Sequence, residues 1–249
     1  GQYAARPGCW AYVPKNPASR FPEGFQILFG PIDNPQWQEP SPGVFGARYE
    51  GRLGKVGLDA EGGWAAFADQ KGDWVFCQRF EYQHGAEYPH GGDAVEVWTQ
   101  GPGVAAGVDF SREDLLLYLM EIEVLGPLVT LQPGESYCMD IEWAAARCPS
   151  PIVSVGAVGC VRQHLSVDSS TNRVRLRGTY GVFVPGTVRA VVVDEIGQAV
   201  AELGVVRGTP LDPLFLDLVV PGAMEGAAVE LWVFDELGQR QGVLERLGR

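Results

Sequence analysis

Side chains that can carry chemistry are concentrated in residues 79–100, RFEYQHGAEYPHGGDAVEVWTQ. This segment holds two of the chain's three histidines, His84 and His90. Because an imidazole titrates near neutral pH, either histidine could transfer a proton as a general acid or base. The Asp and Glu residues of the loop are ligands that calcium prefers, but the histidines lack the close spacing of a zinc site. We therefore predict an acid–base role for the loop, assign no metal ligands, and keep calcium as the one cofactor that its oxygen ligands would suit.

The two ends of this segment are typical of strands, in which side chains alternate between faces. Glu96 and Trp98 share one face of the second strand, and Arg79 belongs to the first. An indole ring can stack on the C–H groups of a sugar while neighbouring polar groups bond its hydroxyls. The alternative is an exposed polar hairpin loop with solvated histidines. The candidate substrate-binding residues are His84, Lys55, Arg79, Tyr88, Glu96 and Trp98.

Two glutamates, Glu121 and Glu123, lie two positions apart in the run LLLYLMEIEV, residues 115–124. On a strand they project from the same face, with their Cα atoms about 6–7 Å apart. If that face is partly buried, mutual repulsion raises the pKa of one carboxyl, which suits proton transfer at a sugar hydroxyl. Both glutamates are candidates for a catalytic base, with His90 or His84 as the acid. The alternative is a pair of solvated or arginine-paired carboxylates.

Lys55 stands between glycines in the run GRLGKVG, residues 51–57. Glycines on both sides allow the backbone to approach a ligand closely, so Lys55 is a further candidate for binding. The alternative is a lysine that simply faces solvent. The sequence contains no G-x-S-x-G nucleophile turn, no phosphate-binding glycine loop before a helix and no C-x-x-C pair. Acyl transfer, nucleotide binding and a structural zinc site are therefore disfavoured.

The composition is that of a folded, acidic chain. Of the 249 residues, 46% are apolar and 20% are charged, which is enough apolar material for a sizeable core. The formal net charge of −12 disfavours nucleic acid and anionic membrane surfaces as partners. No apolar run approaches the roughly 20 residues of a membrane-spanning helix. We expect neither a nucleic-acid partner nor a membrane span.

Glycine and proline punctuate the whole chain and separate short runs rich in Val, Leu, Phe, Tyr and Trp. This pattern is typical of an all-β protein with many short strands. The first 45 residues are rich in proline, and we predict mostly ordered loops there. A single turn of helix is an alternative at residues 63–70 and 142–148. Strands are predicted at residues 25–29, 44–50, 64–68, 74–82, 94–99, 115–124 and 136–143.

The part of the chain after about residue 150 is rich in aliphatic residues and repeats one motif. VRAVVVDEIGQAVAEL (188–203) and VELWVFDELGQRQGVL (229–244) each combine two strands around a D-E-[IL]-G-Q turn. Aspartate with glycine three positions later supplies hairpin turn chemistry. Six or seven strands in about 80 residues are typical of an immunoglobulin-like sandwich. We therefore predict two domains, residues 1–149 and 150–249, with an immunoglobulin-like β-sandwich as the second.

Three motifs in the first part of the chain occur in an order that resembles a known superfamily. They are GRLGKVGLDAEGGWAAF (51–67), RFEYQHGAEYPHGGDAVEVW (79–98) and YLMEIEVLGPLVTLQPGESYCMDIEW (118–143). Together they resemble the C-terminal half of a galactose mutarotase-like domain, and more narrowly a bacterial family of uncharacterised proteins in that superfamily. The resemblance covers residues 8–147 approximately. It implies half of a β-supersandwich, completed by a second chain or by an N-terminal half-domain.

The superfamily includes aldose 1-epimerases and non-catalytic domains of polysaccharide lyases and glycosidases. In the epimerases a glutamate at this point of the chain is the catalytic base, which implies that role for Glu121 or Glu123. We therefore expect a carbohydrate-binding protein related to aldose epimerases, with epimerase-like acid–base catalysis as the enzyme hypothesis. The alternative is a structural or assembly protein whose domains mediate protein–protein contacts. An extracellular or periplasmic location would suit a carbohydrate partner.

Overall fold

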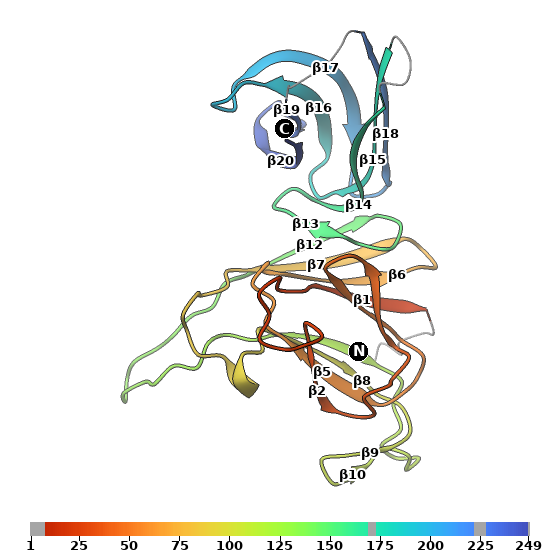
Figure 1. Cartoon of the computed structure of the whole chain (residues 1–249), viewed down its shortest axis with the longest axis vertical. Coiled ribbons are helices and arrows are strands. Elements are labelled where there is room, and N and C mark those ends of the chain that lie inside the picture. Colours follow the sequence, from red (N-terminus) through yellow and green to blue (C-terminus); the bar gives the residue numbers. More distant parts are fainter. Residues whose placement is uncertain (1–7, 169–172, 222–227, 249) are drawn as a thin grey trace. The chain divides into compact units, whose positions relative to one another are not determined.

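The computed structural model describes residues 8–168, 173–221 and 228–248 of the chain. Their regular secondary structure is almost entirely β-strand, as predicted for an all-β chain, and the one helical segment in the described residues is η1, a turn of 3-10 helix over Pro89–Gly91. In the described ranges, no helix has the length and hydropathy that a membrane span requires. The chain divides into two compact units, residues 1–70 with 77–143, and residues 71–76 with 144–249 (Figure 1).

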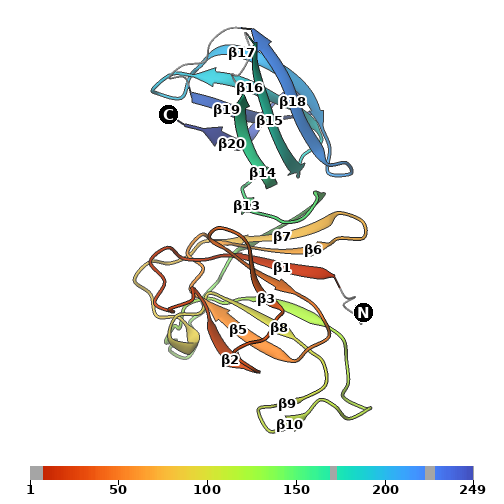
Figure 2. The ribbon, with the colours of Figure 1, turned by 45° about the vertical axis from the view of Figure 1, so that its right-hand side comes forward.

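The first unit has two antiparallel sheets, a larger one of order β12-β7-β6-β1-β4-β3 and a smaller one of order β11-β8-β5-β2 (Figures 1 and 2). In the larger sheet, residues 74–76 of β7 and 144–147 of β12 are grouped with the second unit. A short ribbon pairs β9 (Val104–Ala105) with β10 (Val108–Asp109). The larger sheet contains β1 (Cys9–Pro14), β3 (Trp37–Ser41), β4 (Val44–Arg48), β6 (Trp64–Asp69), β7 (Trp74–Phe80) and β12 (Ile141–Arg147). The smaller sheet contains β2 (Gln26–Phe29), β5 (Gly54–Leu58), β8 (Val95–Thr99) and β11 (Met120–Val124).

Both sheets of the first unit contribute to one hydrophobic core. In β8, Val95 and Val97 are fully buried in this core, and Phe45 enters it from the larger sheet. Because strand side chains alternate, Glu96 and Trp98 of β8 face away from the core. Burial of the aliphatic faces stabilises the fold by about 25 cal/mol per Å² of apolar surface. A slip of one residue would turn these side chains toward solvent, so their burial fixes the register of the strands. The outer face of the smaller sheet is therefore left to its polar residues and to a few aromatic ones.

Several predicted elements of the first unit need correction. The proline-rich first 45 residues contain β1, which lies inside the larger sheet and pairs with β4 and β6. Its residues are buried on both faces, so the strand shows no alternation in the sequence. Residues 142–148 lie largely in the strand β12 instead of a helical turn, because pairing with β7 overrides the helical preference of alanine. Strand β11 begins only at Met120, so residues 115–119 are not part of it.

The loop between β7 and β8 does not close a hairpin. Strand β7 belongs to the larger sheet and β8 to the smaller one, so residues 81–94 pass from one sheet to the other. The hairpin of the predicted alternative is therefore wrong, although much of the loop, including His84, is exposed as that alternative expected. The crossing places the chain segment that contains η1 beside the outer face of the smaller sheet, where it supplies part of the site described below.

The second unit also has two antiparallel sheets, with orders β13-β14-β15-β18 and β17-β16-β19-β20 (Figure 2). Its core is aliphatic and includes the fully buried Leu176 and Leu231, one from each sheet. The strands of the first sheet are β13 (Ser154–Val155), β14 (Gly159–Asp168), β15 (Arg173–Val182) and β18 (Leu214–Pro221). Those of the second are β16 (Gly186–Val193), β17 (Ala199–Gly208), β19 (Ala228–Asp235) and β20 (Arg240–Leu247).

The two repeated D-E-[IL]-G-Q motifs form the predicted hairpins, β16–β17 and β19–β20. In the first turn, the Oδ1 atom of Asp194 accepts hydrogen bonds from the backbone N–H groups of Ile196 and Gln198, at 3.0 and 2.8 Å. Asp235 makes the equivalent bonds in the second turn, at 2.9 and 2.8 Å. The glycine of each turn has φ 78°, a conformation that other residues adopt at a cost. The local sequence is therefore sufficient to explain both hairpins.

Candidate functional site

Strand register arranges the outward side chains of the smaller sheet in two rows, which we call the polar face. Neighbouring strands lie about 4.7–4.9 Å apart, so side chains in one row are within contact distance of each other. From β2 to β11, the first row consists of Phe29, Lys55, Trp98 and Glu121. In the same direction, the second row consists of Gln26, Gly57, Glu96 and Glu123.

Lys55 joins two carboxylates of the polar face. Its Nζ atom donates a hydrogen bond to Glu123 at 3.0 Å and forms a second ion pair with Glu96. Glu96 is only 1% exposed, so its charge depends on these partners. Burial lowers the pKa of Lys55, but hydrogen bonds to Glu96 and Glu123 outweigh burial and raise this pKa above its ordinary value. Lys55 is therefore a fixed positive charge in the middle of the face.

The loop before β8 places His90 on Glu96. The Nδ1 atom of His90 lies 2.6 Å from Oε1 of Glu96. The loop turns sharply, because the backbone N–H groups of Gly92 and Asp93 both donate to the carbonyl of Pro89, at 2.9 and 2.8 Å. His90 itself has φ 49°, in the left-handed region that costs a non-glycine residue about 1–2 kcal/mol. The surrounding contacts hold it there, including the hydrogen bond from its ring to Glu96.

Asp93 is a buried carboxyl at the edge of the same network. Its side chain is fully buried, and its Oδ1 atom accepts a hydrogen bond from Nε2 of Gln26 at 2.8 Å. Burial raises the pKa of Asp93 to about 6, and the neighbouring charge of Glu96 adds to the effect. The same Gln26 amide donates to the carbonyl of His90 at 2.7 Å. Gln26 therefore fixes both the carboxyl and the loop that carries the histidine.

Gly57 makes room for this carboxyl. A Cβ atom built on Gly57 would lie 1.9 Å from Oδ2 of Asp93 and 2.2 Å from its Cγ, which no real structure tolerates. The backbone of Gly57 is not in the left-handed region, so its conformation does not require glycine. The lack of space above the strand is what excludes a larger residue there. The polar face is thus hollowed at one position, and the hollow is filled by an acid.

Trp98 borders the network in the first row. Its indole ring makes edge contacts with Phe29 and Phe110, at centroid distances of 5.1 and 5.6 Å. These contacts hold a half-buried ring in the row that contains Lys55 and Glu121, which is exposed. An aromatic surface therefore lies next to fixed hydrogen-bonding groups.

The predicted site residues divide into two groups. His90, Lys55, Glu96 and Glu123 come together through direct contacts, and Trp98 and Glu121 lie in the same row as Lys55. The other predicted residues, which lie away from this network, are Arg79, His84 and Tyr88.

Each of these three residues has a different environment. Tyr88 is 3% exposed, belongs to the core and stacks on Tyr82 with ring centroids 4.8 Å apart. His84 is exposed, with Nδ1 3.8 Å from a carboxylate oxygen of Glu61. Arg79 forms an ion pair with Glu142 on the larger sheet. The loop position of His84 and Tyr88 suggested a shared site, but neither contacts the residues that His90 contacts.

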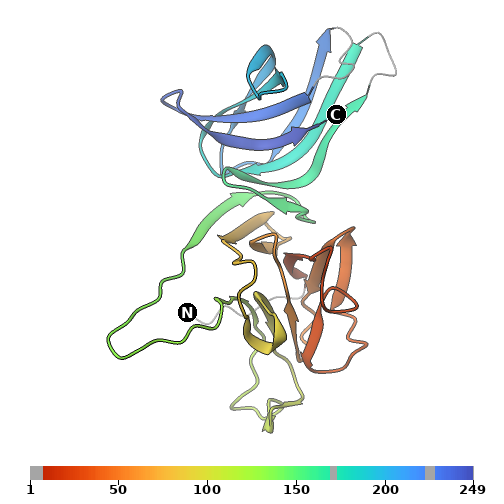
Figure 3. The same cartoon turned by 60° about the vertical axis from the view of Figure 1, so that its left-hand side comes forward.

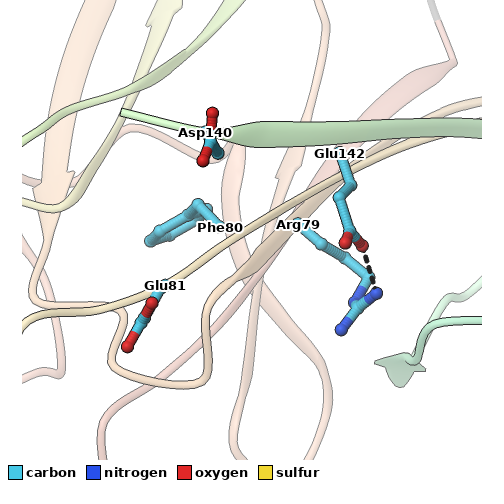
Figure 4. Close-up of a pocket in the computed structure, with 5 residues that line it drawn as sticks. All are labelled: Arg79, Phe80, Glu81, Asp140 and Glu142. Carbon is cyan, nitrogen blue, oxygen red and sulfur yellow. Dashed lines mark hydrogen bonds and ion pairs between the residues drawn. The ribbon is translucent and has the colours of Figure 1, made fainter. Parts of the chain in front are cut away.

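A pocket of about 380 Å³ opens at the β7–β12 edge of the larger sheet. Figure 4 shows the Arg79–Glu142 pair on one side of it, with Phe80 between two further carboxyl groups. Arg79 is therefore already engaged with a carboxylate. The pocket is lined by Arg79, Phe80, Glu81, Asp140 and Glu142.

Sequence reasoning noted Asp93 in the loop but did not choose it as a site residue, and it missed Gln26 and Gly57. The spacing of His90, Asp93 and Glu96, each three residues from the next, is a signal that could have linked them. Gln26 has no local signal, because it reaches the site only through the pairing of β2 with β5. The role of Gly57 likewise depends on which side chain packs above it.

Comparisons with known proteins add no assignment: no family model, curated protein or solved structure matches this chain. The geometry of the polar face is therefore the basis for the proposed function. That geometry consists of a fixed lysine, two glutamates that it bridges, a histidine on one of them, a buried aspartate and an adjacent tryptophan.

Proposed function

We propose that the polar face of the smaller sheet binds carbohydrate. The observation that carries the proposal is the Lys55-centred network with Glu96 and Glu123, set beside the ring of Trp98. Sugars present hydroxyl groups in the plane of the ring and C–H groups on its faces. A protein surface that combines oriented charges with an aromatic ring is complementary to both.

Charge favours neutral sugars over acidic ones. Lys55 is the cation that contacts Glu96 and Glu123, and Asp93 adds a third acid next to them. A uronic acid would bring another carboxylate to a face where acids already outnumber that lysine, and the like charges repel. We therefore expect neutral hexoses and their oligosaccharides to bind and uronates to bind much more weakly.

An epimerase-like activity is the catalytic form of this proposal. Glu123 is held by Lys55, whereas Glu121 is exposed, so the geometry favours Glu123 as the base of the two. His90 is the histidine that reaches the same network, through Glu96. General acid–base catalysis needs two such groups positioned near one sugar. The proposed pair is therefore His90 and Glu123.

We also propose that the first unit is related to galactose mutarotase-like domains. This relation is supported by the all-β first unit, whose Glu-x-Glu strand β11 lies at the edge of the smaller sheet. The immunoglobulin-like proposal for the second unit is supported by its sheets of order β14-β15-β18 and β17-β16-β19-β20, with short β13 beside β14. Sandwiches of that class likewise divide seven to nine antiparallel strands between two sheets.

The binding proposal predicts a specific loss in the Trp98→Ala variant. We expect saturation-transfer NMR and calorimetry to detect at least one neutral hexose or oligosaccharide bound to the wild-type chain. Trp98→Ala should weaken that affinity about tenfold or more, because the aromatic contact is lost, and Glu123→Gln should weaken it less. A parallel NMR assay of anomer interconversion would show whether the bound sugar also reacts.

Trp143→Ala is the matched control for this experiment. Trp143 is 70% exposed and lies on β12 of the larger sheet, so its removal should leave sugar affinity unchanged. If Trp143→Ala abolished binding and Trp98→Ala did not, the sugar would occupy the other sheet. If no sugar in the panel bound at millimolar concentration, the carbohydrate proposal would fail.

A role in assembly has one specific observation in its favour. Residues 125–140 form a long extended connection between β11 and β12, visible in Figure 3. Leu128 and Leu131 in this connection are 56% and 47% exposed, and Tyr137 is 38% exposed. Neighbouring apolar side chains of this kind are typical of an interaction surface. Light scattering that gave a multiple of the monomer mass, combined with no sugar binding, would favour assembly.

A further inference from the structure

We propose that His90, Asp93 and Glu96 form a binding site for a divalent transition-metal cation such as Zn²⁺ or Mn²⁺. Each residue offers one ligand atom, and the three atoms lie within 4.8 Å of one another. The proposal shares His90 and Glu96 with the carbohydrate proposal, but its test measures ion binding alone and does not depend on a bound sugar. With the ion bound, His90 would be a ligand instead of the free acid of an epimerase-like pair. It revises the sequence prediction, in which no metal ligands were assigned.

The ligand distances are close to those of a bound ion. The Nδ1 atom of His90 lies 3.8 Å from Oδ2 of Asp93 and 2.6 Å from Oε1 of Glu96. An ion about 2.0–2.2 Å from each ligand requires ligand atoms about 3–3.5 Å apart. The His90–Glu96 contact must therefore open by less than 1 Å, and the His90–Asp93 contact must close slightly. The side chain of His90 is 56% exposed, so it is free to make this adjustment.

The strongest sign of a missing ligand is the second oxygen of Asp93. Among the residues that the structure describes, Oδ2 of Asp93 is one of few buried side-chain atoms with no hydrogen-bond partner. A buried carboxylate oxygen without a partner is costly, so most such atoms in proteins are satisfied. This oxygen is also the Asp93 atom that lies toward His90. A cation bound between the two side chains would supply the partner that the protein itself does not.

The backbone is shaped to keep this carboxylate in place. Gly57 leaves the space that the carboxyl occupies, and Gln26 holds the other oxygen, Oδ1, at 2.8 Å. Glu96 is buried and cannot turn away to solvent. Two of the three ligands are therefore rigid before any ion arrives, which lowers the entropic cost of binding.

The local charge balance also favours a cation. Four carboxyl groups lie in or beside the cluster: Asp59, Asp93, Glu96 and Glu123. Lys55 is an ion-pair partner of Glu96 and Glu123, and Arg20 contacts the loop through the carbonyl of Gly91 at 2.7 Å. Two positive side chains therefore face four acids. A divalent ion would neutralise the difference.

The ligand types select the class of ion. One imidazole nitrogen with two carboxylates suits Zn²⁺ or Mn²⁺, whereas calcium prefers six to eight oxygen ligands and rarely takes histidine. Three protein ligands leave coordination positions open to water, as in catalytic metal sites. Calcium, the ion that the sequence suggested, is therefore the contrasting case in the experiment.

The test is calorimetric titration of the full chain with Zn²⁺, Mn²⁺ and Ca²⁺ separately. The Cys138→Ser chain is the background, because Cys138 is exposed and its thiol could bind zinc on its own. We expect one Zn²⁺ or Mn²⁺ per chain and at least tenfold weaker binding of Ca²⁺. His90→Ala, Asp93→Asn and Glu96→Gln should each weaken Zn²⁺ or Mn²⁺ binding about tenfold or more.

His84→Ala is the matched control. His84 is the other histidine of the same crossing loop, is exposed, and lies outside the cluster. The His84→Ala variant should bind the ion with the same affinity as the unsubstituted background. Circular dichroism of each variant checks folding, and Asp93→Asn keeps the shape of the side chain if Glu96→Gln unfolds. The proposal is overturned if neither Zn²⁺ nor Mn²⁺ binds at 1:1 stoichiometry, or if the folded cluster variants bind as tightly as His84→Ala.

Discussion

Gly57→Ala is expected to destabilise the protein by about 2–4 kcal/mol, a large effect for the addition of one methyl group. The new Cβ would lie 1.9 Å from Oδ2 of Asp93 and 2.4 Å from Oδ1, so the carboxyl has to leave its position. It cannot simply rotate into solvent, because Asp93 is fully buried. Urea unfolding monitored by circular dichroism measures the loss.

A double-mutant cycle separates this clash from an ordinary effect of glycine replacement. Asp93→Ala removes the carboxyl, so adding Gly57→Ala to that background should be neutral or slightly stabilising. Alanine is favoured over glycine within a strand by roughly 0.5–1 kcal/mol. Gly156→Ala is a further control, since its Cβ would meet nothing closer than 3.8 Å. Equal losses from Gly57→Ala with and without Asp93 would contradict the packing explanation.

Asp93→Asn is expected to stabilise the metal-free protein at pH 7–8, by about 1–3 kcal/mol. Burial raises the pKa of Asp93 from 3.8 to about 6, so the folded state prefers the protonated form. At pH 7–8 the wild-type protein must hold a buried carboxylate whose Oδ2 atom has no hydrogen-bond partner. The amide of asparagine is neutral at every pH, which removes this cost. Each unit of pKa shift corresponds to about 1.4 kcal/mol, which sets the upper end of the range.

The pH dependence follows from the direction of this shift. Because the pKa is raised in the folded state, the contribution of Asp93 to stability is fully present below about pH 4. It is lost as the pH rises through about 6, where the folded protein releases the proton. The stability difference between Asp93→Asn and wild type should therefore be near zero at pH 4 and reach its maximum above pH 7.

Urea unfolding of both chains in the presence of EDTA, at intervals from pH 4 to pH 8, measures this difference. His90 and Glu96 also face Asp93, so repeating the comparison in a His90→Gln background separates the titration of the imidazole. A difference that stayed constant with pH would contradict a raised pKa. A destabilised Asp93→Asn variant at pH 8 would mean that the carboxylate has a partner in the metal-free protein.

The stability and the cation-binding predictions for Asp93→Asn together distinguish a functional acid from a structural one. If the aspartate served only the fold, its replacement by asparagine would lower the stability of the protein. Asp93 is instead expected to reduce stability at neutral pH while providing a ligand, and such a trade-off is typical of binding and catalytic sites. The same Asp93→Asn variant should thus become more stable and bind a cation less well. Misfolding cannot produce both results.

The sequence by itself determined the fold class and much of the local structure. Short Val- and Leu-rich runs between glycines and prolines predicted an all-β chain, because strand and turn preferences act over a few residues. The two D-E-[IL]-G-Q hairpins form as predicted, because the aspartate at the first position, here Asp194 and Asp235, bonds the turn backbone directly. The shared face of Glu121 and Glu123 also followed from strand alternation alone.

The sequence also singled out most of the residues that lie on or beside the polar face. Lys55 was selected for its glycine neighbours, His90 for its proton-transfer chemistry, and Glu96, Trp98 and the Glu121/Glu123 pair for the strand faces that they share. Strand β1 was missed, because a strand buried on both faces has no alternation to detect. Tyr88 and Arg79 were selected for position in the chain, yet Tyr88 is in the core and Arg79 is paired with Glu142.

Only the tertiary structure decided which of these residues meet. The pairing of β5 with β8 and of β8 with β11 puts Lys55 between Glu96 and Glu123, residues far apart in the chain. His84 and His90 are six residues apart in one loop, yet His84 lies near Glu61 and His90 contacts Glu96. The hollow at Gly57 exists only when Asp93 packs above it. Long-range register is set by burial of the whole core, and no local pattern encodes it.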